Sequence, residues 1–289
     1  MLTNTIFIAI TGLILVYIAA IALLYVPASE RKGGLGAQQL MVSRSACSLV
    51  ILAVLVGGDV WLGQKGVVTG LLLGLTTYFM FQAIAAFGRP ALTLSMLVLS
   101  PVLLLGYTFI SGGSISPYAF LALLLALPGL ILLLEPWKWQ KERESRSLVG
   151  LLYGIGAAIV YATFLVVAHN EQLSGMHQYL QSAFWQAVGC LFFGLIGSIG
   201  TFRAAAAILK QKKELFRELI LFSVANGIFF FLGNSMVLSV LKPVEASLFL
   251  LLESLMVALF GLFVYRQRLQ WYQWAGMILA ILGAWLIGR

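Results

Sequence analysis

Two ionisable side chains, Glu253 and Arg44, interrupt long apolar stretches of this sequence. Glu253 follows the apolar run 248–252 and lies about ten residues after Pro243. A carboxyl group in such a setting can exchange a proton or pair with a cation, because apolar surroundings favour its neutral form. A guanidinium can bind an anion or pair with a carboxylate. Each also has a structural explanation: Glu253 as a hydrogen-bonded brace between helices, and Arg44 with its head group extended to an aqueous surface.

Uncharged polar residues recur in the same kind of stretch. Tyr78 and Gln82 are four positions apart, so they would share one face of a helix. Asn234 and Ser235, preceded by Asn226, form a similar set later in the chain. Hydrogen bonds between helices explain such residues equally well. Only their gathering around one cavity would indicate a binding site.

Two aromatic residues and a further carboxylate complete the candidate set. Tyr161 and Trp185 lie inside apolar runs, where they can line a site for a ring or an organic cation, or simply face lipid. Glu245 comes two residues after Pro243, at the expected start of a helix. The helix dipole favours a carboxylate there, so we expect capping, with substrate binding as the alternative.

The composition places the chain in a lipid bilayer. Hydrophobic residues make up 61% of the sequence and charged residues 10%, and the mean hydropathy is +1.01. An ordinary soluble domain carries about a quarter charged residues. The net charge of +8 does not indicate nucleic-acid binding, because the basic residues lie in short gaps between apolar runs, where a membrane explains them better.

Ten apolar segments are long enough to cross a hydrocarbon layer of about 30 Å. The runs are continuously apolar, without the alternation of barrel strands, so we expect an all-α integral membrane protein. The segments are 4–26, 36–56, 66–87, 90–111, 116–134, 148–168, 178–200, 218–240, 243–264 and 270–288.

The chain reads as a duplication. Arg89-Pro90 and Lys242-Pro243 each open an apolar run, 153 positions apart. Five segments per copy is an odd number, so the second copy must enter the membrane the opposite way round. We therefore predict two inverted five-helix repeats, over residues 1–144 and 145–289.

Basic residues predict how these segments are oriented. Thirteen of them follow the first, fifth, seventh and ninth segments, including Arg31, Lys138, Arg217 and Arg266. The positive-inside rule then places those loops in the cytoplasm and both termini outside it. The mixed-charge stretch 203–218 is expected to form a short helix along the cytoplasmic surface.

The last helices carry a family resemblance. The Pro-opened segment with Leu252-Glu253, followed by a basic turn and the stretch 274–283 (WAGMILAILG), resembles the final two helices of the drug/metabolite transporter superfamily, in its EamA-like branch. Arg44, within Ser43-Arg44-Ser45-Ala46, is similar to that family's second helix. The chain departs from the family pattern at Tyr265-Arg266, where Gly-Glu is common, and it lacks Trp-Gly in the first segment.

The resemblance implies a secondary carrier that works by alternating access around a central cavity. We expect a proton-linked or facilitative carrier of a small polar or amphipathic metabolite, with the third, fourth, eighth and ninth segments lining the path. A lipid flippase or a non-transporting assembly protein is the alternative. The expected setting is the inner membrane of a bacterium, and the expected partners are a small-molecule substrate, the bilayer and, through the fifth and tenth segments, a second copy of the chain.

Catalytic and cofactor motifs are missing from the sequence. It has no HExxH, Walker A or GxSxG motif, and Cys47 and Cys190 lie in separate apolar runs without metal-ligand spacing. His169 and His177 flank a short polar stretch that is better explained as a solvated loop. We therefore expect neither an enzyme nor a bound cofactor or metal.

Overall fold

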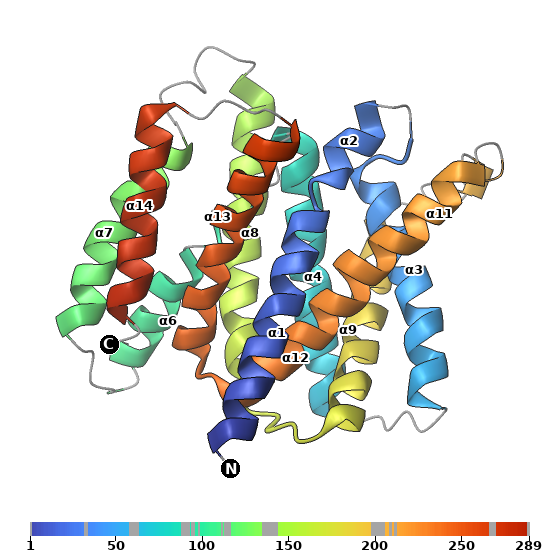
Figure 1. Cartoon of the computed structure of the whole chain (residues 1–289), viewed down its shortest axis with the longest axis horizontal. Helices are drawn as coiled ribbons and strands as arrows, with labels where there is room; N and C mark the ends of the chain where they lie inside the picture. The colour runs from blue at the N-terminus through green and yellow to red at the C-terminus, as the bar shows by residue number, and fades with distance from the viewer. Residues whose placement is uncertain are drawn as a thin grey trace.

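Long helices that run side by side make up the computed structural model (Figure 1). The residues that the structure describes are 2–31, 34–57, 64–87, 93, 96–97, 99–110, 112, 117–134, 144–197, 206–207, 210, 213–265 and 270–287. Within them the secondary structure is helical and contains no strand. The all-helical prediction is confirmed.

Each of the ten predicted segments contains a helix. In the first half these are α1 (Leu2–Ala22), α2 (Tyr25–Arg31), α3 (Ala37–Val56), α4 (Gln64–Phe87), α6 (Leu99–Ile110) and α7 (Pro117–Leu134). In the second half they are α8 (Glu144–His169), α9 (Met176–Gly197), α11 (Lys213–Phe222), the π-helix η2 (Ser223–Ile228), α12 (Phe229–Val240), α13 (Pro243–Tyr265) and α14 (Trp271–Ile287).

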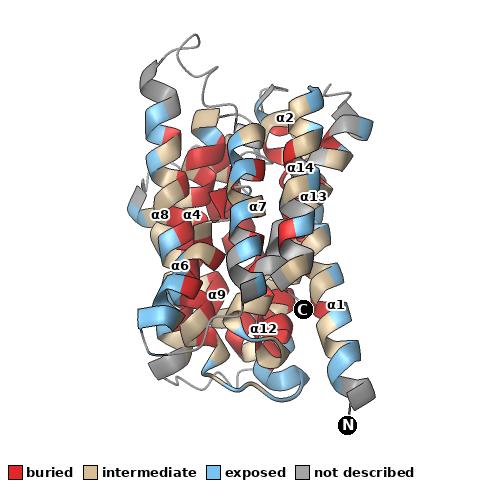
Figure 2. Ribbon diagram, turned by 90° about the vertical axis from the view of Figure 1, so that its left-hand side faces the viewer, coloured by how far each residue is buried: buried red, intermediate tan, exposed pale blue. Residues whose placement is uncertain are grey.

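Six of the helical stretches among the described residues are long and apolar enough to cross a membrane. They are Thr5–Glu30, Ala37–Val56, Gly66–Phe87, Leu148–His169, Met176–Ile196 and Leu215–Val240. The outward surface agrees with lipid contact, since large apolar side chains such as Val54 and Phe263 are more than 75% exposed. Figure 2 shows the buried residues gathered between the helices and the exposed ones on their outer faces. The chain is an integral, multi-pass membrane protein.

The expectation of a separate surface helix over 203–218 is wrong for residues 213–218. Residues 213–218 belong to α11, which continues through η2 into α12 as one apolar helix over Leu215–Val240. Leu219 and Phe222 are buried, so packing against the bundle fixes this end of the helix. Most of the remaining stretch, 203–212, lies outside the described residues.

Glycines allow two helix pairs to come into backbone contact. α4 packs on α9, and a Cβ at Gly189 would overlap the carbonyl oxygen of Gly70. α1 packs on α12, where a Cβ at Gly233 would lie 2.8 Å from the carbonyl oxygen of Gly12. Small residues at such crossings let dispersion contacts and weak backbone contacts hold helices together in lipid. These contacts fix α1, α4, α9 and α12, the helices that surround the Arg44 side chain.

Candidate functional site

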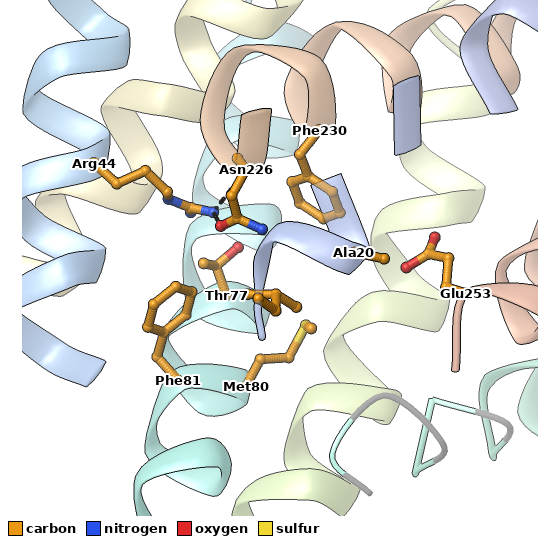
Figure 3. Close-up of a pocket in the computed structure, with 9 residues that line it drawn as sticks. Ala20, Arg44, Thr77, Met80, Phe81, Asn226, Phe230 and Glu253 are labelled. Carbon is orange, nitrogen blue, oxygen red and sulfur yellow. Dashed lines mark hydrogen bonds between the residues drawn. The ribbon is translucent and has the colours of Figure 1, made fainter. Parts of the chain in front are cut away.

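A small hollow lies in the interior of the bundle, between the two halves of the chain. It measures about 20 Å³, room for about one water molecule. Its walls come from α1, α3 and α4 of the first half and from η2, α12 and α13 of the second (Figure 3). The described residues that line it are Ala20, Leu23, Arg44, Thr77, Met80, Phe81, Asn226, Phe230 and Glu253. We call it the central hollow.

Arg44 projects from α3 into this hollow and is 1% exposed. Its Nη1 donates hydrogen bonds to the backbone carbonyl of Asn226, at 2.9 Å, and to the Oδ1 atom of the same residue. Its Nε and Nη2 atoms are buried and make no hydrogen bond. The explanation in which Arg44 extends its head group to the surface is therefore wrong, because the side chain turns inward.

Two phenylalanine rings flank the guanidinium. Its central carbon lies 5.2 Å from the ring centroid of Phe81 and 5.3 Å from that of Phe231. At such distances the negative faces of the rings attract the cation, by about 2 kcal/mol or more where water is absent. The rings thus hold the cation in place while they leave one edge of it without a hydrogen-bond acceptor.

The π-helical turn presents Asn226 to Arg44. A π-helix inserts an extra residue into the turn, and such turns are frequent at functional sites. Asn226 also donates from Nδ2 to the carbonyl oxygen of Ala19 at 2.7 Å, so it links η2 to both α1 and α3. Ser48 on α3 donates to the carbonyl of Ser223 at 3.1 Å, which satisfies another carbonyl of the widened turn. Gly227 leaves room for this approach, because a Cβ there would overlap the Ser48 hydroxyl.

Glu253 lies on the other side of the hollow. It is 2% exposed, and its Oε1 atom has no hydrogen-bond partner. In Figure 3 its carboxyl group lies beyond Ala20, away from Arg44. Among the described residues, Glu253 and Arg44 are the two ionisable groups that line the hollow. The hollow thus presents a guanidinium on one side and a carboxyl group on the other, with apolar side chains between them.

Thr77 adds a buried hydroxyl near Arg44. It is 3% exposed, and its Oγ1 lies beside the Cys190 thiol and makes no hydrogen bond to an oxygen or nitrogen atom. In Figure 3 its hydroxyl is turned towards the contact between Arg44 and Asn226. The pair Thr76-Thr77 within an apolar run is the sequence feature that could have indicated Thr77. The sequence predicts a site on the face of α4 that carries Tyr78 and Gln82, whereas the adjoining face, with Thr77 and Phe81, lines the hollow.

The other predicted site residues do not line the central hollow, but three of them, Tyr161, Asn234 and Ser235, make buried polar contacts in the second half, and a fourth, Trp185, packs nearby. Tyr161 on α8 donates to Asn234 Oδ1 at 3.3 Å, and Ser235 accepts a 3.0 Å hydrogen bond from Gln186 Nε2 on α9. Trp185 lies beside Gln186 and packs on α4, where a Cβ at Gly66 would lie 3.1 Å from its ring.

The three remaining predicted residues lie elsewhere. Tyr78 packs edge-on against Tyr153 of α8, with ring centroids 6.5 Å apart, and Gln82 is partly buried on the same helix. Glu245 accepts a 3.1 Å hydrogen bond from the backbone nitrogen of Lys242, which is the capping geometry expected of it.

Hydrogen bonds to carboxylates connect the helices at opposite ends of the bundle. At the end where α2 lies, the Tyr25 hydroxyl donates to Glu218 Oε2 at 2.7 Å and its ring packs on Phe222. Towards the other end, Thr69 on α4 donates to Glu171 Oε1, after α8, also at 2.7 Å. In Figure 1, α2 lies at the top of the view and the connection between α8 and α9 at the bottom.

No group of three or more metal-binding side chains occurs among the described residues. Cys190 is buried on α9, beside Arg44 and Thr77, and Cys47 is half-buried on α3. Both cysteines are free thiols.

Comparison with known proteins gives a family for the second half. Residues 148–289 match the model of the EamA-like transporter family, which confirms the resemblance inferred from the final helices. No curated protein matches the chain. A solved structure titled "Crystal structure of protein" is similar over 99% of this chain and 97% of its own, with a TM-score of 0.66 and 15% identical residues. At that identity the likeness shows a shared fold and nothing about substrate.

Proposed function

We propose that this chain, whose residues 148–289 belong to the EamA-like transporter family, is a secondary transporter that moves a small polar or amphipathic molecule across the membrane by alternating access. The observation that carries the proposal is the central hollow, with Arg44 and Glu253 buried on its two sides.

Buried ionisable groups are unfavourable in this setting. A charged side chain at mid-membrane costs about 2.5–3.5 kcal/mol on insertion scales, and such groups usually face a pathway for ions or solutes. Arg44 and Glu253 each retain polar atoms without a hydrogen-bond partner. A bound solute would supply those hydrogen-bond partners. A purely structural role for Arg44 and Glu253 does not explain why these buried atoms lack them.

The packing of the helices supports two inverted repeats. In an inverted repeat, α1 would correspond to α8, α3 to α9, α4 to α12 and α7 to α14. A two-fold axis that relates the repeats would then exchange the packed pair α4–α8 with the packed pair α12–α1. Both pairs are in contact, as are α3 with α9 and α7 with α14, each of which the axis exchanges with itself. With η2 counted as the start of α12, the same exchange relates the contact of α4 with α9 to the contact of α3 with η2. In such carriers the substrate binds near mid-membrane, between the repeats.

Alternating access requires that the hollow open to one side at a time. The contacts of Tyr25 with Glu218 and of Thr69 with Glu171 are suited to be the two closures, since each joins different helices at one end of the bundle. With both contacts formed the hollow measures about 20 Å³, and in the proposed cycle this arrangement is a narrow state that must open before a solute can enter.

Glu253 is the proposed proton-coupling site. Purified protein in liposomes should take up a solute, and Glu253→Gln should abolish the dependence of uptake on a pH gradient, because the amide cannot exchange a proton. Glu245→Gln is the matched control, since Glu245 lies at a helix start outside the hollow. Unchanged transport and unchanged pH dependence in Glu253→Gln would make Glu253 structural. Movement of lipid without any solute would support a flippase instead.

A further inference from the structure

We infer that Arg44 binds the carboxylate group of the transported molecule through its Nε–Nη2 edge, an inference that rests on the proposed transport function. The substrate class is therefore a small organic carboxylate, with its carbon skeleton against the apolar side chains of the central hollow, which must widen beyond its 20 Å³ to admit it.

The guanidinium is divided between two roles. Nη1 is committed to Asn226, where it donates to both the backbone carbonyl and Oδ1. Nε and Nη2 form the opposite edge, which presents two parallel N–H donors and has no partner. Two parallel N–H donors match the two oxygens of a carboxylate, and this bidentate pairing is the strongest geometry that arginine makes.

The surroundings of that edge contain no competing acceptor among the described residues. The Cys190 thiol lies beside Arg44 and interacts with its guanidinium, but sulfur is a weak hydrogen-bond acceptor, and Nε and Nη2 have no oxygen or nitrogen acceptor. No carboxylate of the described residues is hydrogen-bonded to Arg44. A fully buried cation without an anion beside it is unfavourable, so an incoming carboxylate would gain both the two hydrogen bonds and the charge neutralisation.

Thr77 supplies a third donor on the same side. Its hydroxyl is buried beside the Cys190 thiol, which is a weak hydrogen-bond partner, and it is turned towards the Arg44–Asn226 contact (Figure 3). Three donors suit a singly charged carboxylate. A phosphate group, with a third terminal oxygen and up to two charges, would need further donors, whereas the hollow otherwise offers apolar side chains and the Glu253 carboxyl group. The apolar walls, formed by Leu23, Met80 and Phe230, suit a hydrocarbon skeleton.

Ligand binding to the unaltered protein tests the chemistry directly. The probes are acetate, butyrate and 3-phenylpropionate, the amide and the amine matched to each, and propylphosphonate, and the readout is the thermal unfolding midpoint in detergent. We expect saturable stabilisation by at least one carboxylate and none by its matched amide or amine. Equal stabilisation by an amide, preference for propylphosphonate, or no response to any carboxylate would overturn the inference.

Two variants assign the effect to named groups. Arg44→Lys keeps the charge but loses the two-pronged edge, and it should weaken carboxylate binding at least tenfold, the change expected when a charge-assisted hydrogen bond is lost. Thr77→Val should weaken binding by a factor of about three to ten. Arg217→Lys and Thr163→Val, both at exposed positions, are the matched controls and should stay within about twofold. Unchanged carboxylate affinity in a folded Arg44→Lys protein would contradict the inference even if Thr77→Val had an effect.

The outcomes separate this inference from the proposed function. If liposomes take up the amines or amides while carboxylates are ignored, the protein is a transporter and Arg44 does not bind a carboxylate. If a carboxylate binds at Arg44 but no solute crosses the membrane, the binding site stands and transport is wrong.

Discussion

Arg44 Nη1 and the backbone carbonyl of Asn226 are 2.9 Å apart, and this hydrogen bond joins residues 182 positions apart in the chain. It connects α3 of the first half to the π-helical turn of the second half at the wall of the central hollow. If the two halves move relative to one another, either α3 and η2 move together or this hydrogen bond breaks. One of the contacts that join the two halves is therefore also part of the proposed binding site.

Asn226→Ala should destabilise the protein, because it leaves a donor of Arg44 and the carbonyl of Ala19 without their side-chain partner. We expect the free energy of unfolding to fall by about 2 kcal/mol or more. The midpoint of thermal unfolding in detergent measures this, with the exposed Asn170→Ala as control. An equal, small effect of both substitutions would show that the links from Asn226 to α1 and α3 contribute little.

Gly189→Ala should disrupt the crossing of α4 and α9, since its methyl group would overlap the carbonyl oxygen of Gly70. Overpacking of this kind costs about 3 kcal/mol. Gly106→Ala on α6 is the matched control, because a Cβ there meets nothing within 4 Å. That substitution should be neutral, or stabilising by up to about 1 kcal/mol through helix propensity. Comparable yields and unfolding midpoints for the two variants would contradict the close approach of α4 to α9.

Tyr25→Phe and Thr69→Val should loosen opposite ends of the bundle. Tyr25→Phe removes the donor to Glu218, so amide hydrogen exchange should speed up several-fold at α2 and the start of α11. Thr69→Val removes the donor to Glu171 and should have the same effect around residues 170–176. Mass spectrometry measures the amide hydrogen exchange. If either substitution increased exchange equally at both ends of the bundle, the proposal that the two contacts close opposite ends would be contradicted.

Reporter fusions test the predicted orientation. The end of α2, which carries Arg31, and the start of α11, which carries Arg217, lie at the end of the bundle opposite the N-terminus in Figure 1. The positive-inside rule assigns that end to the cytoplasm, so a reporter at the C-terminus should be active only if it functions outside the cytoplasm. Activity from a reporter that works only in the cytoplasm would reverse the assignment.

The helices could be predicted from the sequence because apolar run length is a strong signal in membrane proteins. All ten predicted segments contain a helix, and Pro243 begins α13 as expected for proline at a first helical position. The continuity of α11 with α12 was missed because mixed charge at 203–218 resembles a surface helix. Hydropathy averages cannot show that Leu219 and Phe222 are buried against neighbouring helices.

The site was only partly predictable. Arg44 and Glu253 stood out because charge is rare in apolar runs, and both line the hollow. Thr77 and Phe81 were missed because a shift of one residue on a helix turns the side chain by about 100°. A sequence does not give that rotation without the partner helices. The π-helical turn that brings Asn226 to Arg44 has no local sequence signature either, since it depends on contacts from α1 and α3.

The central claim is that the hollow between the two halves opens to each side of the membrane in turn. Ala20 lines the hollow and is 2% exposed, so Ala20→Cys, with Cys47→Ala and Cys190→Ala, places one thiol inside it. We expect a membrane-impermeant thiol reagent to label this cysteine when added to either side of oriented liposomes. Labelling from only one side, or from neither side while the protein transports solute, would contradict alternating access through the hollow.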